Sequence, residues 1–171
     1  LKQRLGTSTL NREQAMIGFT SLWRPAIGYP LPITGFTKKQ CLSLQSKYMP
    51  SFSSKMGLNR HTPNAIKYGP LRLGGLDIPT VWAEQGSGHV KLALSHLRKN
   101  DDVGKLLNVT LDGLQLHAGV PWPVLSQRGN VTRTYIPHTW ATHLWEYLDS
   151  VEVQLHRERP TLLCPQRQHD S

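Results

Sequence analysis

Eight basic residues and no carboxylate lie between Glu13 and Asp77 of this 171-residue chain. The basic residues are Arg24, Lys38, Lys39, Lys47, Lys55, Arg60, Lys67 and Arg72. The formal net charge of the whole chain is +9, so this interval holds nearly all of the excess. A block of one sign repels itself unless an anion lies nearby, and a polyphosphate backbone is a common anion of that kind. The pattern therefore indicates nucleic acid as a partner. The alternative is a solvated basic surface that only keeps the protein soluble.

The rest of the composition excludes several classes of protein. Hydrophobic residues make up 38% of the chain, which is enough for a core, and the length fits one domain. No apolar run approaches the ~20 residues that span a bilayer, so we expect no membrane association. We find no signal peptide, and Cys41 and Cys164 are too few for a disulfide framework. These features favour an intracellular protein, nuclear or cytoplasmic, that is not secreted. The chain begins at Leu1, which suggests a piece of a longer protein.

Apolar residues spaced three and four apart predict an all-α chain of about six helices, without a convincing strand. The first helix begins near residue 9, and we expect Pro25 to end or kink it. A capping box at Thr37 and Gln40 predicts a second helix that Gly57 ends. Its apolar stripe consists of Cys41, Leu44, Tyr48 and Phe52, which leaves Lys38, Lys39 and Lys47 off the stripe. A short helical turn follows at residues 64–68.

Two longer helices are predicted to form a helical hairpin near residues 80–116. The first begins near Thr80 and runs to about Lys99, and Asn100 and Asp101 cap the second. The expected inward residues of the first are Trp82, Gly86, Val90, Ala93, Leu94 and Leu97. Those of the second are Val103, Leu106, Leu107, Thr110, Leu111 and Leu114.

The C-terminal part is predicted to hold a loop, one helix and a tail. Residues 119–135 have the composition of a long loop, and a last helix begins at Pro137. Its inward residues are Trp140, Leu144, Tyr147, Leu148, Val151 and Leu155. We expect residues 1–159 to form a single helical domain and residues 160–171 to be a disordered tail.

Four short motifs give the chain a resemblance to a known family. They are residues 55–60 (KMGLNR), 68–76 (YGPLRLGGL), 84–86 (EQG) and 94–98 (LSHLR). Their order and spacing resemble the region downstream of the polymerase domain in reverse-transcriptase-like proteins of eukaryotic retrotransposons. The resemblance covers roughly residues 21–119. It implies a thumb-like helical extension that contacts the backbone of a primer–template duplex and that follows missing palm and fingers domains.

The resemblance also implies a parent enzyme, an RNA-directed DNA polymerase that needs Mg²⁺. A polymerase palm holds its metal ions with paired aspartates and a further carboxylate. The only adjacent aspartates here, Asp101 and Asp102, lie in a polar segment between two helices. We therefore predict no catalytic residues, no cofactor and no metal in this chain, and no activity of the chain alone. The eight histidines also lack the spacing of a zinc site.

Two functions remain open on this evidence. The first is a non-catalytic C-terminal fragment of a retroelement reverse transcriptase that binds an RNA–DNA hybrid or duplex. Its predicted binding residues are Lys38, Lys39, Lys47, Lys55, Arg60, Lys67 and Arg72. The alternative is a helical protein–protein or intramolecular docking module with no nucleic-acid role, whose leucine-rich segment at residues 80–116 carries the contact.

Overall fold

The computed structural model describes residues 9–59, 61–127 and 136–156, and these residues confirm the all-α class. Within them the secondary structure is helical, with no β-strand. The chain divides into two compact units, residues 1–88 and 89–171, and the boundary falls inside helix α6. The predicted single domain over residues 1–159 stays a prediction. The predicted tail at residues 160–171 lies outside the described residues.

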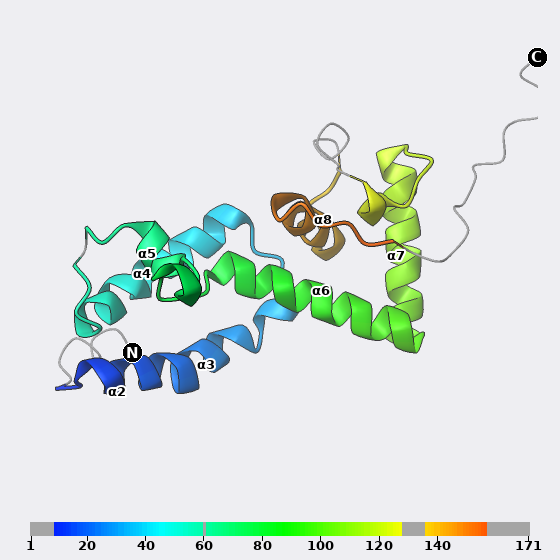
Figure 1. Ribbon diagram of the computed structural model, residues 1–171. Helices are drawn as coiled ribbons and strands as arrows, with labels where there is room; N and C mark the ends of the chain where they lie inside the picture. Colours follow the sequence, from blue (N-terminus) through cyan, green and yellow to red (C-terminus); the bar gives the residue numbers. More distant parts are fainter. Residues whose placement is uncertain (1–8, 60, 128–135, 157–171) are drawn as a thin grey trace, which may run out of the picture. The chain divides into compact units, whose positions relative to one another are not determined.

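The first unit begins with a continuous helical rod, which is followed by further helices and two short 3-10 turns (Figure 1). The rod consists of α2 (Arg12–Gly18), a π-helical stretch η1 (Phe19–Trp23) and α3 (Arg24–Gly28). A 3-10 turn η2 (Leu31–Ile33), then α4 (Lys38–Lys55), α5 (Asn64–Tyr68) and a 3-10 turn η3 (Leu71–Leu73) follow. Helix α6 (Val81–Lys99) begins in this unit.

The helix does not end at Pro25, which excludes the first of the two predicted outcomes, an end or a kink. Proline removes one N–H and crowds the carbonyl four residues earlier. Here Pro25 is the second residue after the π-helical stretch, whose wider turn relaxes this crowding and shifts the hydrogen-bond register. The helix therefore continues to Gly28, and the Tyr29 amide donates to the Pro25 carbonyl at 2.9 Å.

Helix α4 begins and ends where the sequence predicts. The Thr37 hydroxyl accepts from the Gln40 amide, and the Gln40 side chain accepts from the Thr37 amide. Gly57, with φ of 73°, follows the last turn. The buried stripe differs from the predicted one, because Gln45 and Met49 are buried and Leu44 and Tyr48 are half-buried.

The core of the first unit is a small cluster of aromatic and sulfur-containing side chains. Phe19 packs edge-on against Phe52, with ring centroids 4.9 Å apart, and Trp23 stacks on Phe19 at 5.6 Å. Met49 and Met56 fill the remaining space in this cluster. These contacts join the N-terminal rod to α4, so they also determine which side of α4 faces solvent.

The second unit holds the end of α6, then α7 (Asp102–Ala118), a 3-10 turn η4 (Val124–Ser126) and α8 (Trp140–Ser150). Its core gathers Leu111 and Leu114 of α7 with Leu144, Trp145 and Leu148 of α8. The Trp145 indole also donates to the Gln127 carbonyl at 3.0 Å. Thr139 caps α8, so the helix begins three residues after the predicted Pro137.

Helices α6 and α7 lie at the predicted positions, but they cross at a corner rather than running back along one another (Figure 1). Gly104 makes the corner possible, because a Cβ there would overlap the carbonyl oxygen of His96. This close approach rotates α7 and buries Asn108 and Gln115. Val103, Leu106 and Thr110, predicted to face inward, are exposed, and Leu94 of α6 is exposed as well.

The buried His143 makes the stability of the second unit sensitive to pH. Burial lowers the pKa of the His143 imidazole below its ordinary 6.5, and the neighbouring Glu146 carboxylate, 3.6 Å away, offsets only part of this effect. His138, stacked against the ring at 5.9 Å, lowers the pKa further. Unfolded His143 therefore takes up a proton at a higher pH than folded His143 does.

We accordingly expect the melting temperature to fall as the pH drops below about 6.5, because the unfolded state then binds more protons. Above that pH the contribution of His143 to stability is fully present. A His143→Gln variant should show a flatter profile of melting temperature against pH. The exposed His117→Gln variant is the matched control, and a profile that it flattens equally would contradict the assignment.

Candidate nucleic-acid interface

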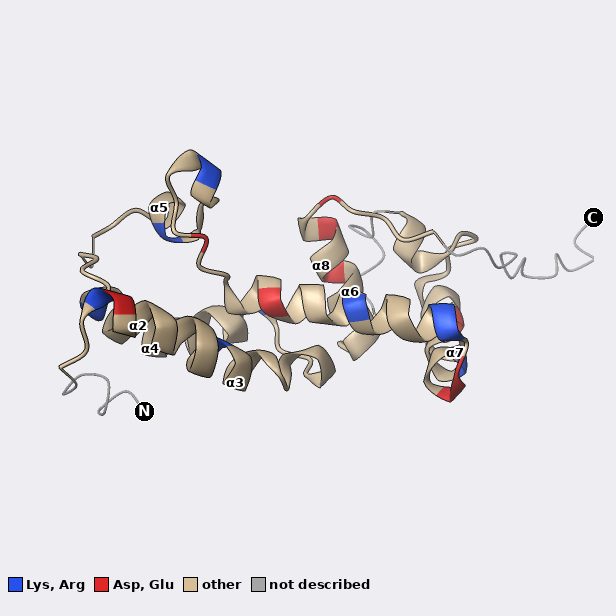
Figure 2. Cartoon of the chain, turned by 60° about the horizontal axis from the view of Figure 1, so that its bottom comes forward, with Lys and Arg blue, Asp and Glu red and all other residues tan. Residues whose placement is uncertain are grey.

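The predicted binding residues that the structure describes all belong to the first unit. Lys38 and Lys39 lie in the first turn of α4, Lys47 and Lys55 lie further along it, and Lys67 lies on α5. Arg72 lies in η3, and the Lys and Arg positions are blue in Figure 2. Arg60 lies outside the described residues.

The exposure of these side chains differs. Lys38, Lys39, Lys47 and Arg72 are exposed, whereas Lys55 and Lys67 are half-buried. Among the described residues, no carboxylate lies within ion-pairing distance of the ammonium or guanidinium groups of a set of five: Lys38, Lys39, Lys47, Lys67 and Arg72. Their positive charge is therefore not neutralised by these parts of the chain.

Arg24 belongs to the same basic interval but has a structural partner. Its guanidinium donates to the Glu84 carboxylate in the first turn of α6. This pair joins the N-terminal rod to α6 within the first unit. The charge of Arg24 is thus offset by Glu84.

The lysines at positions 39, 47 and 55 step evenly around the axis of α4. Successive members are eight residues apart, so each step turns the side chain by about 80°. Lys39 lies seven residues before Ser46, and Lys47 lies seven residues before Ser54, so each is within about 20° of one of these serines. Lys55 lies five residues after Pro50, about 140° around the axis from it. Lys39 and Lys47 therefore lie along or beside the side of α4 that carries the two serines, and Lys55 lies away from it.

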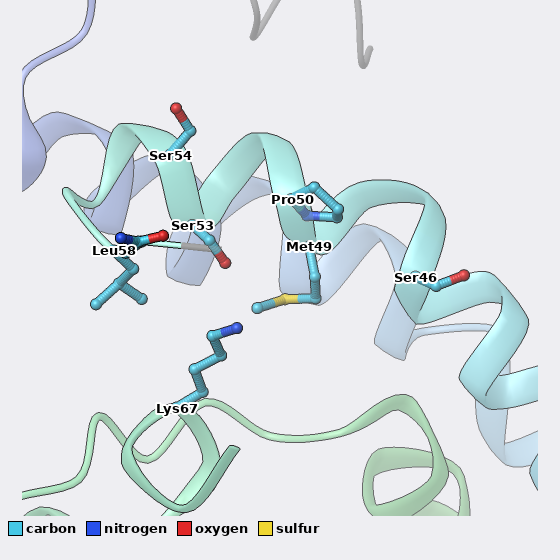
Figure 3. Close-up of a pocket in the computed structure, with 8 residues that line it drawn as sticks. Ser46, Met49, Pro50, Ser53, Ser54, Leu58 and Lys67 are labelled. Carbon is cyan, nitrogen blue, oxygen red and sulfur yellow. The ribbon is translucent and has the colours of Figure 1, made fainter. Parts of the chain in front are cut away.

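A pocket of about 400 Å³ opens on that side of α4. One wall is formed by residues three and four apart on α4, namely Ser46, Met49, Pro50, Ser53 and Ser54. Lys67 of α5 faces this wall, and Leu58 and Asn59, which follow α4, complete the lining (Figure 3). Figure 3 shows the Lys67 side chain reaching from α5 toward Met49 and Ser53. The sequence did not predict this pocket, because Lys67 meets the α4 wall only after α4 and α5 pack together.

Gln45 holds the elements around this region in place. Its side-chain amide nitrogen donates to the Tyr68 hydroxyl at 2.6 Å, and its oxygen accepts from the Val81 amide at 3.0 Å. Burial raises the pKa of the nearby Tyr48 hydroxyl, and Tyr68 and Glu84 add to this effect. The phenol of Tyr48 therefore stays neutral and supplies no charge to the basic surface.

The motif at residues 84–86 forms a second buried anchor. Gln85 is fully buried, and its amide nitrogen donates to the Phe36 carbonyl at 2.8 Å. Its oxygen accepts from the Thr34 hydroxyl at 3.2 Å. The neighbouring Gly88 faces Pro32, whose Cγ would lie only 2.8 Å from an added Cβ. These contacts hold the segment before α4 against α6.

The motif at residues 68–76 forms a compact turn in which backbone packs on backbone. The Leu76 amide donates to the Ile66 carbonyl at 2.8 Å, and the Asp77 amide donates to the Gly69 carbonyl at 2.9 Å. Gly74 adopts a left-handed φ of 79°, and Gly75 faces the Gly69 carbonyl directly. This motif therefore positions α5, and with it Lys67, against α4.

The adjacent aspartates have local structural roles. Asp101 caps α7, accepting from the Gly104 amide at 2.8 Å, and its other oxygen lies 2.8 Å from His96 Nδ1. The Gly104 amide, and then His96, hold the pKa of Asp101 below its ordinary value. Asp102 is exposed and pairs with Lys105 at 3.0 Å. Within the described residues no three His, Cys, Asp or Glu side chains gather as metal ligands would.

Comparison of the chain with protein-family models, with curated protein sequences and with solved structures found no match. None of the helices that the structure describes is long and apolar enough to cross a membrane.

Proposed function

We propose that this chain is a non-catalytic fragment of a retroelement reverse transcriptase, and that it binds the backbone of an RNA–DNA hybrid or duplex. The observation that carries the proposal is the set of basic side chains on α4, α5 and η3, in a stretch of sequence without carboxylates. Lysine and arginine neutralise phosphates without reading sequence, and each contact releases counterions. The motif resemblance supplies the family named in the proposal.

The first turn of α4 supports binding of an anion. Lys38 and Lys39 lie where the helix macrodipole is positive, so each lysine is disfavoured there by its own helix. No acidic residue lies in that turn to offset them. A phosphate near this end would relieve the repulsion of the two lysines and would interact favourably with the dipole.

Fluorescence anisotropy with a labelled RNA–DNA hybrid tests the proposal, with the salt concentration raised stepwise from a low value. We expect affinity to fall steeply, with a log–log slope that corresponds to about four or more phosphate contacts. Absence of binding even at low salt would overturn the proposal.

A second function, a docking module for another protein, is favoured by one separate observation. The side of α7 that carries Val103, Leu106, Val109 and Leu116 is exposed, and Leu106 and Val109 are 66% and 67% accessible. An apolar helix face of this kind is typical of a contact surface. Sedimentation velocity over a range of protein concentrations tests this function. A chain that stays monomeric at every concentration and binds no apolar partner would count against it.

A further inference from the structure

The pocket between α4 and α5 has a lining that suits a ligand with both a negative charge and an apolar face. Its volume of about 400 Å³ lies within the ~300–1,000 Å³ typical of small-molecule sites. Met49, Pro50 and Leu58 supply apolar surface, and Lys67 supplies one positive charge. No carboxylate lines the pocket. The chemistry therefore excludes a cation and favours an anionic ligand.

The polar groups of the lining retain free hydrogen-bonding capacity. The Ser46 hydroxyl donates to the Ser43 carbonyl at 2.8 Å, which leaves its lone pairs open. The Asn59 side-chain oxygen accepts from the His61 amide at 3.2 Å, and its NH₂ group has no partner among the described residues. Pro50 has no N–H to offer the Ser46 carbonyl four residues earlier, so that carbonyl lacks its usual helical donor. Both donors and acceptors are thus available to a ligand.

From this combination we infer that the pocket accepts one unpaired nucleotide of the bound strand, with the phosphate on Lys67 and the base against Met49, Pro50 and Leu58. A free inorganic phosphate would use the charge but leave the apolar wall bare. A neutral apolar ligand would bury the Lys67 ammonium without a counter-charge, which is costly. A nucleotide satisfies both, because its base has an apolar face and polar edges, and its phosphate is anionic.

The position of the pocket on α4 agrees with this assignment. Lys39 lies within about 20° of Ser46 around the helix axis, and Lys47 within about 20° of Ser54, so a strand that contacts both lysines passes close to the mouth of the pocket. The inference rests on the proposed function, because these two lysines would hold the strand whose unpaired nucleotide enters. The pocket gives a preference for unpaired nucleotides to a surface that otherwise contacts only the phosphate backbone of the nucleic acid.

Anisotropy binding of the full chain to a blunt hybrid, and to the same hybrid with a short single-stranded overhang, tests the inference. We expect the overhang to bind about five- to tenfold more tightly, in line with one added base contact. A Ser54→Trp variant places a large side chain at the exposed edge of the pocket without changing charge. We expect it to lose the overhang preference and to keep blunt-hybrid binding.

The matched control is Ser95→Trp, which adds the same bulk at an exposed position of α6 in the second unit, outside the pocket lining and not on α4 with its lysines. It should keep the preference. Equal binding of the two hybrids, or a preference that survives Ser54→Trp, would overturn the pocket assignment and leave the backbone-binding function intact.

A second readout separates failure of the pocket from failure of the proposed function. Titration of the chain with a nucleoside monophosphate, followed by NMR, reports on the pocket without a duplex. Shifts that Ser54→Trp abolishes would support the pocket even if hybrid binding were absent. No binding of the nucleotide or of either hybrid would overturn both proposals.

Discussion

We expect the Lys39→Glu, Lys47→Glu double variant to bind an RNA–DNA hybrid at least about tenfold more weakly than the unmodified chain at low salt. Both ammonium groups are exposed, and neither is paired with a carboxylate among the described residues. They lie about 80° apart around the axis of α4 and about 12 Å apart along it, so a single strand can contact both. The slope of log affinity against log salt should decrease by about two, one for each lost phosphate contact.

The control for this variant carries the same change in net charge at two exposed lysines of the second unit, Lys91→Glu and Lys105→Glu. It should retain most of the affinity, because Lys39 and Lys47 can still contact the strand. Only the general attraction between the net positive charge and the phosphates is weakened. Circular dichroism of both variants establishes that the helices remain. If the two double variants lost affinity equally, binding would depend on overall charge, and the predicted surface on α4 would be wrong.

The second large effect is expected at Gly75, where alanine should destabilise the fold by more than about 3 kcal/mol. A Cβ at this position would overlap the Gly69 carbonyl oxygen, which belongs to the backbone and cannot rotate away as a side chain does. The Gly69 carbonyl also accepts from the Asp77 amide, so moving it breaks a hydrogen bond. Urea denaturation monitored by circular dichroism measures the loss.

Two other glycines serve as controls for this prediction. Gly74 has open space around its Cβ position but a φ of 79°, so alanine should cost only about 1–2 kcal/mol. Gly113 has open space within α7, and alanine there should raise stability by up to about 1 kcal/mol. A Gly75→Ala variant no less stable than Gly74→Ala would contradict the close approach of the two backbone segments.

Since Gly75 lies in the turn that positions α5, its substitution bears on function as well. Lys67 reaches the pocket only because α5 packs beside α4, and the backbone bonds from Leu76 and Ile78 to residues 66 and 67 hold α5 there. The motif at residues 68–76 therefore has a structural explanation in this fold. Its glycines permit close backbone packing, which local sequence patterns do not reveal.

The sequence alone predicted most helix positions, because caps and breakers act over a few residues. The Thr37–Gln40 capping box, Gly57 and the Asp101 cap lie where local chemistry requires them. At Pro25 the same reasoning left two outcomes open, an end or a kink, and the helix does not end there. Proline disfavours an α-helix interior, and the π-helical stretch that accommodates it depends on Phe19 and Trp23 packing against α4.

The inward faces of the helices were predicted less well. Hydrophobicity placed Leu106 inside and left Gln45 and Asn108 out of the predicted stripes, whereas Leu106 is exposed and the two amides are buried. Gln45 is buried because three groups from α4, α5 and α6 satisfy one another's hydrogen bonds. Asn108 is buried because the Gly104 corner sets the rotation of α7. Such choices depend on partners distant in sequence.

The charge pattern belongs to the sequence itself. Between Glu13 and Asp77 the chain carries eight basic residues and no acidic one, whatever its fold. Only the tertiary structure decided how some of those charges are used: Arg24 pairs with Glu84, and Lys67 lines a pocket. The amino-acid composition fixes the total charge of the chain. Which charged side chains meet a carboxylate and which face solvent depends on the packing of helices that are distant in sequence.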